Sequence, residues 1–213
     1  MANHVYFNIS INGLSEEQHD TMFKSEVNNR PHWKEGEDPI EFRELVDLHE
    51  QPFMSKVDRV YDDEGWIENS YNWYIDNCGA KWVDIEEWED TISGYSAWSA
   101  PIHMVEHMLE WASNQFNIEL SASMTYEDEF RNFIGVDHFE TYHEDGEYYC
   151  SHSENYIDGN ELTAILEEEL GCDVSDDDFE WFEEYKATGL VPQECIDEMV
   201  YEFFDTGELK WAS

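Results

Sequence analysis

Basic residues are scarce in this sequence, since ten Lys and Arg stand against 52 Asp and Glu in 213 residues, a formal net charge of −42. Proteins that bind DNA or RNA need cations to displace counterions from phosphates, so this balance excludes ordinary nucleic-acid binding. It excludes binding to an anionic membrane surface for the same reason. The partners to expect are therefore cations, in the form of metal ions, salt or the basic face of another protein.

Cysteines and long apolar runs are also few. The four cysteines, Cys78, Cys150, Cys172 and Cys195, have no CxxC spacing, which favours reduced cytosolic thiols over a disulfide framework. No run approaches the ~20 apolar residues that a membrane helix needs, and the first ten residues have neither the basic nor the apolar region of a signal peptide. We therefore expect a cytoplasmic protein.

Aromatic residues, in contrast, are abundant, with nine Trp, twelve Tyr and twelve Phe. Disordered acidic chains are poor in such residues, because they cannot bury enough surface to offset the entropy of ordering the chain. The composition therefore predicts a folded protein with an acidic exterior.

Periodic patterns predict mixed α and β structure in the first part of the chain. Residues 4–11 alternate and predict a strand, and Ser15 is the expected N-cap of a helix that buries Met22, Phe23 and Val27. The other expected elements are a polar insertion at 28–65, a helix ended by Gly79, a strand within 91–100, a helix that opens at Pro101, and strands at 117–126, 130–143 and 146–153, with turns at 127–128 and 145–146.

From residue 158 onward the apolar period becomes helical. Three successive apolar stripes end at Gly171, Gly189 and Gly207, which predicts three short amphipathic helices. We predict two domains: an α+β domain at 1–153 and an acidic helical subdomain at 154–213.

Three tryptophan-centred motifs carry a resemblance to a known family. NWYIDNCGAKW, GYSAWSAP and YEDEFRNFIGV are similar to the patterns Trp-x-x-x-Asn-Trp-Gly-Thr-Lys-Trp, Thr-Ala-Trp-Ser-Pro-Pro and Tyr-x-Asp-Glu-x-x-x-Phe-x-Gly of the YubB-type ferredoxin-like domain of plasmids and phages. The similarity covers roughly residues 66–145, where Cys78, Ala80 and Ala100 replace the family's Trp, Thr and first Pro. It implies a mobile-element origin and an α+β fold: a ferredoxin-like antiparallel sheet with packed helices, here followed by the C-terminal acidic three-helix appendage. It implies no activity.

Two short motifs could hold a metal ion. HMVEH places His103, Glu106 and His107 in the inverted zinc-protease spacing, although partly exposed helix histidines are the simpler interpretation. Asp173, Ser175, Asp177 and Glu184 fall at four calcium-loop positions, but Asp178 stands where the loop requires Gly. We therefore expect no specific metal site.

Catalytic patterns are not evident in the sequence. It has no glycine-rich phosphate loop, no G-x-S-x-G and no Cys–His pair with suggestive spacing. We predict that the protein is not an enzyme, has no catalytic residues and uses no cofactor.

The negative charge increases toward the C-terminus. Residues 165–185, ILEEELGCDVSDDDFEWFEEY, hold ten carboxylates and no Lys or Arg. At ~1.5 Å rise per helical residue this is about one charge per 3 Å, close to the ~3.4 Å between phosphates of one DNA strand. The density predicts a DNA mimic that inhibits a basic DNA- or RNA-binding protein. The resemblance to a family of plasmids and phages implies that the mimic is phage-encoded and acts in the host cytoplasm, on a target such as a restriction or CRISPR-type defence enzyme.

The expected partner-binding residues are the carboxylates that the helical pattern leaves outside, together with a second cluster near residue 88. They are Glu161, Glu167, Glu168, Glu169, Asp173, Asp176, Asp177, Asp178, Glu180, Glu183, Glu184, Asp197, Glu198, Glu202, Asp205, Glu86, Glu87, Glu89 and Asp90. A homodimer would lengthen this surface, although no residue requires one. The alternatives are a salt-adapted protein, whose acids would be spread evenly, and a calcium-binding accessory protein of a mobile element.

Overall fold

The computed structural model describes residues 3–22, 48, 51–54, 70–87, 91–129, 132–159, 161, 164 and 193–208. Its elements in chain order are β1 His4–Asn12, α1 Glu16–Asp20, α2 Ser70–Cys78, β2 Val83–Glu87, β3 Ile92–Ala97, α3 Ile102–Phe116, β4 Ser121–Asp128, β5 Phe133–Glu144, β6 Glu147–Asp158 and α6 Gln193–Thr206. The six strands form one antiparallel sheet in the order β2-β3-β1-β4-β5-β6. The predicted α+β class is therefore confirmed.

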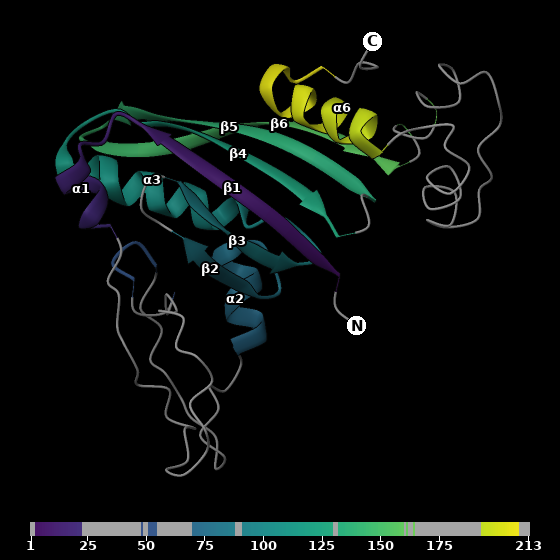
Figure 1. The fold of residues 1–213 in the computed structure, drawn as a ribbon. Coiled ribbons are helices and arrows are strands. Elements are labelled where there is room, and N and C mark those ends of the chain that lie inside the picture. The colour runs from purple at the N-terminus through teal and green to yellow at the C-terminus, as the bar shows by residue number, and fades with distance from the viewer. Residues whose placement is uncertain are drawn as a thin grey trace, which may run out of the picture.

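The main core lies between the sheet and helices α2 and α3, which cover one of its faces (Figure 1). Val5, Phe7 and Ile9 alternate along β1 and are fully buried, because every second side chain of a strand points to the same face. From α3, Met104, Met108 and Ala112 meet this face at four-residue helical spacing. The alternating and helical patterns of the sequence thus specify the two layers.

Helix α6 packs on the opposite face of the sheet, above β5 and β6 (Figure 1). Val200 and Phe203 form a second, smaller cluster with Ile134, Val136 and Ile157. Strand β5 is therefore buried on both faces in its first half, and Ile134 and Val136 point away from Phe139, which belongs to the main core. This second layer is a contact between segments far apart in the sequence.

Two glycines end helices as expected. Gly79 follows α2 with φ 78°, and its N–H donates to the Ile75 carbonyl at 3.1 Å; Gly207 follows α6 with φ 72° and donates to the Phe203 carbonyl at 2.8 Å. A left-handed residue at this position satisfies a free carbonyl of the last helical turn, and glycine adopts it without a steric penalty. The third C-terminal helix is thus present as α6, whereas the residues of the two preceding predicted helices lie almost entirely outside the described part.

Several expected boundaries were wrong. The turn after β4 begins at Glu129 rather than at 127–128, since β4 continues through Asp128. Strand β6 extends to Asp158, five residues past the expected end, because its later residues pair with β5. Helix α1 is five residues long and ends before Met22, and Pro101 occupies the N-cap of α3 rather than its first turn. Phe23 and Val27 lie outside the described residues.

Candidate binding surface

Helix α6 is anchored so that one face is buried and the other is acidic. Beside the apolar contacts of Phe203, the Asn155 amide of β6 donates to the Gly207 carbonyl at 2.6 Å. This bond fixes the C-terminal end of the helix on β6. On the outer face, Glu202 and Asp205 are exposed, and Tyr201 is 68% exposed.

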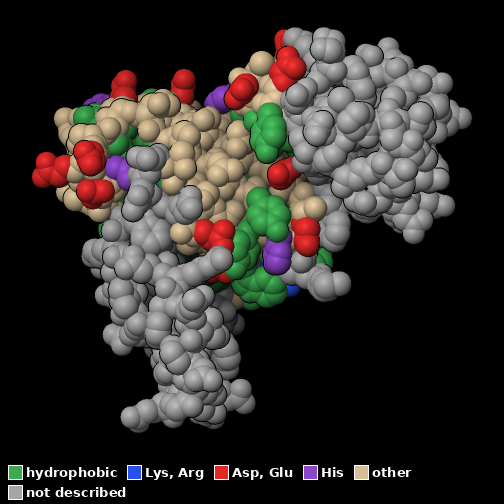
Figure 2. Space-filling model, in the orientation of Figure 1, with side chains coloured by type: hydrophobic (Ala, Val, Ile, Leu, Met, Phe, Trp, Pro, Cys, Tyr) green, Lys and Arg blue, Asp and Glu red, His purple; other side chains and the backbone are tan. Residues whose placement is uncertain are grey.

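Exposed carboxylates continue from α6 along the edge of the sheet formed by β6. We define the acidic edge as the exposed residues Glu140, Glu144, Asp145, Glu147, Glu154, Asp158, Glu161, Glu202 and Asp205. The twelve residues of β6 span about 40 Å at ~3.3 Å per residue. Figure 2 shows Asp and Glu side chains around the margin of the described surface.

Burial and nearby carboxylates raise the pKa of several groups on β6. The pKa of the exposed Tyr149 is raised mainly by Glu147, whose carboxylate also accepts the Tyr149 hydroxyl at 3.3 Å. Burial, and then Asp158 and Glu154, raise the pKa of Tyr156. Burial, followed by Glu106 and Glu110, raises the pKa of the Cys150 thiol to about 12. Negative charge from several carboxylates therefore acts along the whole length of β6.

Histidines are the side chains that lie closest to carboxylates in the two carboxylate–histidine pairs found between described residues. The Glu106 carboxylate of α3 lies 2.8 Å from His152 Nδ1 of β6, and Glu129 lies 3.9 Å from His4 Nδ1. Among the described residues, Lys81 is the sole Lys or Arg, and it precedes β2, at the opposite edge of the sheet. The acidic edge is thus not neutralised by a basic residue of the described part.

The structure brings together only some of the predicted partner-binding residues. Glu202 and Asp205 lie on α6, and the Glu161 N–H donates to Asp158 at the end of β6; Asp197 and Glu198 also belong to α6. Glu86 and Glu87 belong to β2, and Glu86 is exposed. Strand β2 is the other edge of the sheet, about 24 Å from β6 at ~4.8 Å per strand. Outside the described residues lie Glu167, Glu168, Glu169, Asp173, Asp176, Asp177, Asp178, Glu180, Glu183, Glu184, Glu89 and Asp90.

The histidine motif of α3 does not gather around a common point. His103 lies against Gly79, while Glu106 pairs with His152 from β6. Across the described ranges there is no group of three His, Cys, Asp or Glu residues that could hold a metal ion. The calcium-like stretch from Asp173 to Glu184 falls outside those ranges.

The open face of the sheet beside α6 is a feature that the sequence analysis missed. On this face β1 and β4 present the small, uncharged residues Asn8, Ser10, Ser121, Ser123 and Thr125, and at one end the cross-strand pair Tyr6 and Glu127. Figure 2 shows it as a mainly tan area between acidic margins. The alternation of Ser and Asn with buried residues in β1 and β4 was the signal that could have predicted it.

Comparison with known proteins gives no relative. No protein-family model matches the chain, and neither a curated protein nor a solved structure matches it. Within the described residues, none of the helices has both the length and the apolar character needed to span a membrane.

Proposed function

We propose that this protein is a DNA mimic that binds and inhibits a basic nucleic-acid-binding host protein, presenting carboxylates in place of DNA phosphates. The observation that carries the proposal is the acidic edge: nine exposed carboxylates on β5, β6, α6, the turn between β5 and β6 and the turn after β6, with no Lys or Arg among the described residues near them. Such an arrangement accelerates encounters with a positively charged groove and loses affinity as salt is added.

The size of the acidic edge fits this function. Its length of about 40 Å along β6 is slightly more than one turn of B-DNA, which is ~34–36 Å.

The fold supports an origin in a mobile element. We infer that β1, β2, β3 and β4 with α2 and α3 form a ferredoxin-like unit, since the strand order β2-β3-β1-β4 with a helix before β2 and another before β4 is the split βαβ arrangement. β5, β6 and α6 are then additions to that unit, and they carry the acidic edge. The YubB-type motifs, which belong to plasmids and phages, lie mostly in the unit itself, and the host cytoplasm is the proposed location.

A salt-adapted protein is the main alternative, and the open face of the sheet argues against it. Adaptation to high salt favours acids over the whole surface, whereas Asn8, Ser10, Ser121, Ser123 and Thr125 form an uncharged area next to the acidic edge. The unequal distribution favours a surface built for recognition.

A pair of charge-reversal variants tests the proposal. Glu154→Lys, Glu202→Lys and Asp205→Lys together change the acidic edge, whereas Glu17→Lys, Asp20→Lys and Glu119→Lys make the same charge change at exposed positions on α1 and between α3 and β4. In pull-downs from a bacterial lysate, the first variant should lose the captured protein and the control should keep it. Equal loss in both would mean that net charge alone drives binding, and the acidic edge would not be the recognition surface.

A further inference from the structure

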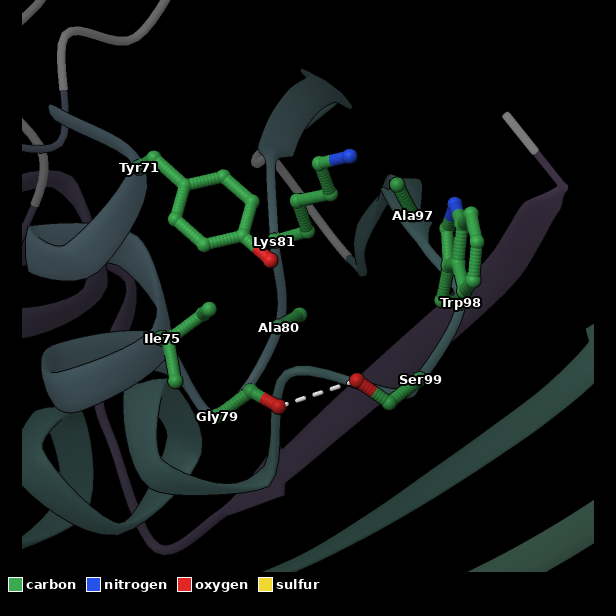
Figure 3. A pocket seen from close by; sticks show the side chains of 8 residues that line it. All are labelled: Tyr71, Ile75, Gly79, Ala80, Lys81, Ala97, Trp98 and Ser99. Carbon is green, nitrogen blue, oxygen red and sulfur yellow. Dashed lines mark hydrogen bonds between the residues drawn. The ribbon is translucent and has the colours of Figure 1, made fainter. Parts of the chain in front are cut away.

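A pocket of about 270 Å³ opens between helix α2 and the segment that joins β3 to α3. Tyr71 and Ile75 of α2 form one wall and Trp98 the other, while Gly79, Ala80 and Ser99 form the floor (Figure 3). The Ser99 hydroxyl donates to the Gly79 carbonyl at 2.9 Å, which ties the two sides of the floor together. The pocket lies at the β2–β3 side of the sheet, away from the acidic edge.

Three exposed aromatic rings surround a positive charge, and two of them, Tyr71 and Trp98, line this pocket. The Lys81 Nζ lies 4.5 Å from the ring centroid of Trp82, 5.1 Å from that of Tyr71 and 5.3 Å from that of Trp98. All three distances are within the ~6 Å over which an aromatic face attracts a cation. The only Lys or Arg of the described residues is thus held by three π faces, and the structure itself shows that they accommodate an ammonium group.

Trp98 is placed in this position at a cost to its backbone. Its φ of 77° is in the left-handed region, which is an outlier for a bulky residue, and its side chain is 63% exposed. The Trp98 N–H donates to the Asn3 carbonyl at 3.1 Å, which holds the conformation. A large apolar ring that is both strained and exposed is not explained by core packing, and strained residues of this kind gather at binding sites.

The pocket size and the charge of the protein indicate the occupant. A volume of about 270 Å³ is below the ~300–1,000 Å³ of typical small-molecule sites, so it suits a single side chain. The net charge of −42 repels anions and attracts cations. An arginine guanidinium is planar, stacks on aromatic faces and is more weakly hydrated than an ammonium group, so it matches the aromatic walls best.

We propose that this pocket receives an arginine side chain of a protein partner, stacked on Trp98, and that Lys81 occupies the aromatic rings until it is displaced. The proposal deepens the proposed function, because a basic DNA-binding protein supplies such arginines. The pocket and the acidic edge are then two separate contact points, at opposite sides of the sheet, with different chemistry: stacking at one and charge at the other.

The test uses a small probe, so that it does not depend on finding the partner. Nα-acetyl-arginine methylamide is titrated into the full chain, and the indole N–H signal of Trp98 is followed by NMR, with the citrulline analogue as the neutral control. Arginine should shift this signal and citrulline should not. Tyr71→Ala should weaken binding about tenfold, while Tyr201→Ala, which removes an exposed ring on α6, should leave it unchanged.

The effect of Lys81→Met on arginine affinity distinguishes an arginine site from an anion site. Lys81→Met removes the competing cation but keeps the aliphatic stem, so arginine should bind several-fold more tightly. If Lys81→Met weakens binding, or if inorganic phosphate shifts the Trp98 signal and Lys81→Met abolishes that shift, the pocket is an anion site and the proposal is overturned. Equal binding of arginine and citrulline would overturn it as well. If the arginine probe binds but a pull-down captures no basic partner, the proposed function fails while the arginine pocket stands.

Discussion

Asp137 of β5 stands directly opposite Glu154 of β6 in the antiparallel ladder, which places two carboxyl groups on the same face of neighbouring strands. Asp137 is fully buried, and neither of its carboxylate oxygens has a hydrogen-bond partner. Like charges directly opposite each other destabilise a sheet, and burial disfavours the charged form. Burial, and then Glu154, raise the pKa of Asp137 to about 6, against smaller opposite effects of His152 and of the nearby Asn155 backbone N–H, which is not aligned for a full hydrogen bond.

This pair predicts that stability falls as the pH rises from about 4 to about 6. The pKa of Asp137 is higher in the folded state than its ordinary value of 3.8, so the folded state binds more protons in that window. Asp137→Asn should remove this part of the pH dependence and should raise the free energy of unfolding at pH 7 by about 1–3 kcal/mol. Urea unfolding at pH 4, 5, 6 and 7 measures it. An unchanged pH slope in Asp137→Asn would show that the carboxyl group is solvated.

Because α6 packs through its own small apolar cluster, we expect that α6 can detach from the sheet while the main core stays folded. Phe203→Ala removes the fully buried side chain that holds α6 on β5 and β6, a change that costs about 3–5 kcal/mol in a well-packed site. Hydrogen exchange should accelerate in α6 and β6, while amides of β1 and β4 stay protected. Tyr201→Ala, on the exposed side of the same helix, is the matched control. Uniform loss of protection in Phe203→Ala would mean that both layers unfold together.

The close approach of β2 to Gly94 of β3 leaves no room for a side chain at position 94. A Cβ atom there would lie 2.0 Å from the Asp84 carbonyl oxygen, which belongs to the backbone of β2 and cannot turn aside. Gly94→Ala should therefore destabilise the protein by more than about 2 kcal/mol. At Gly146 nothing lies within 4 Å and only the φ of 94° opposes a side chain, so Gly146→Ala should cost less, about 1 kcal/mol. Thermal unfolding compares the two; a smaller effect at Gly94 would mean that β2 shifts readily.

Added salt should stabilise the folded chain. With a net charge of −42, screening reduces self-repulsion as the Debye length falls from ~30 Å at 0.01 M to ~10 Å at 0.1 M salt. We expect the melting temperature to rise over this range, with a folded protein already present at the lower concentration. A chain that folds only in molar salt would support salt adaptation instead of recognition.

The sequence predicted those parts of the fold that depend on neighbours in the chain. Strand β1 follows from its alternation, the end of α2 from Gly79 and the end of α6 from Gly207. β2 was missed, since its five residues are too few to show a period next to the Trp-rich stretch before it. The extent of β6 was underestimated because its final residues are held by pairing with β5, not by their own pattern.

The candidate sites were predictable only in part, because both depend on contacts between distant segments. The sequence indicated that α6 would be acidic outside, but not that it lies on the face of the sheet opposite α3. It could not show that Glu86 and Asp205 occupy opposite edges. Tyr71, Lys81 and Trp98 come from three separate segments, and only the fold brings them to one pocket.

The most direct test of the central claim is competition with DNA. The tagged full chain is used to capture proteins from a bacterial lysate at low salt, and the resin is then washed with duplex DNA or, in parallel, with ~0.5 M salt, at which the Debye length is only a few ångströms. A DNA mimic predicts that one nucleic-acid-binding protein is retained and that DNA releases it as completely as salt does. A captured protein that salt removes and DNA does not, or the absence of any nucleic-acid-binding protein on the resin, would contradict mimicry.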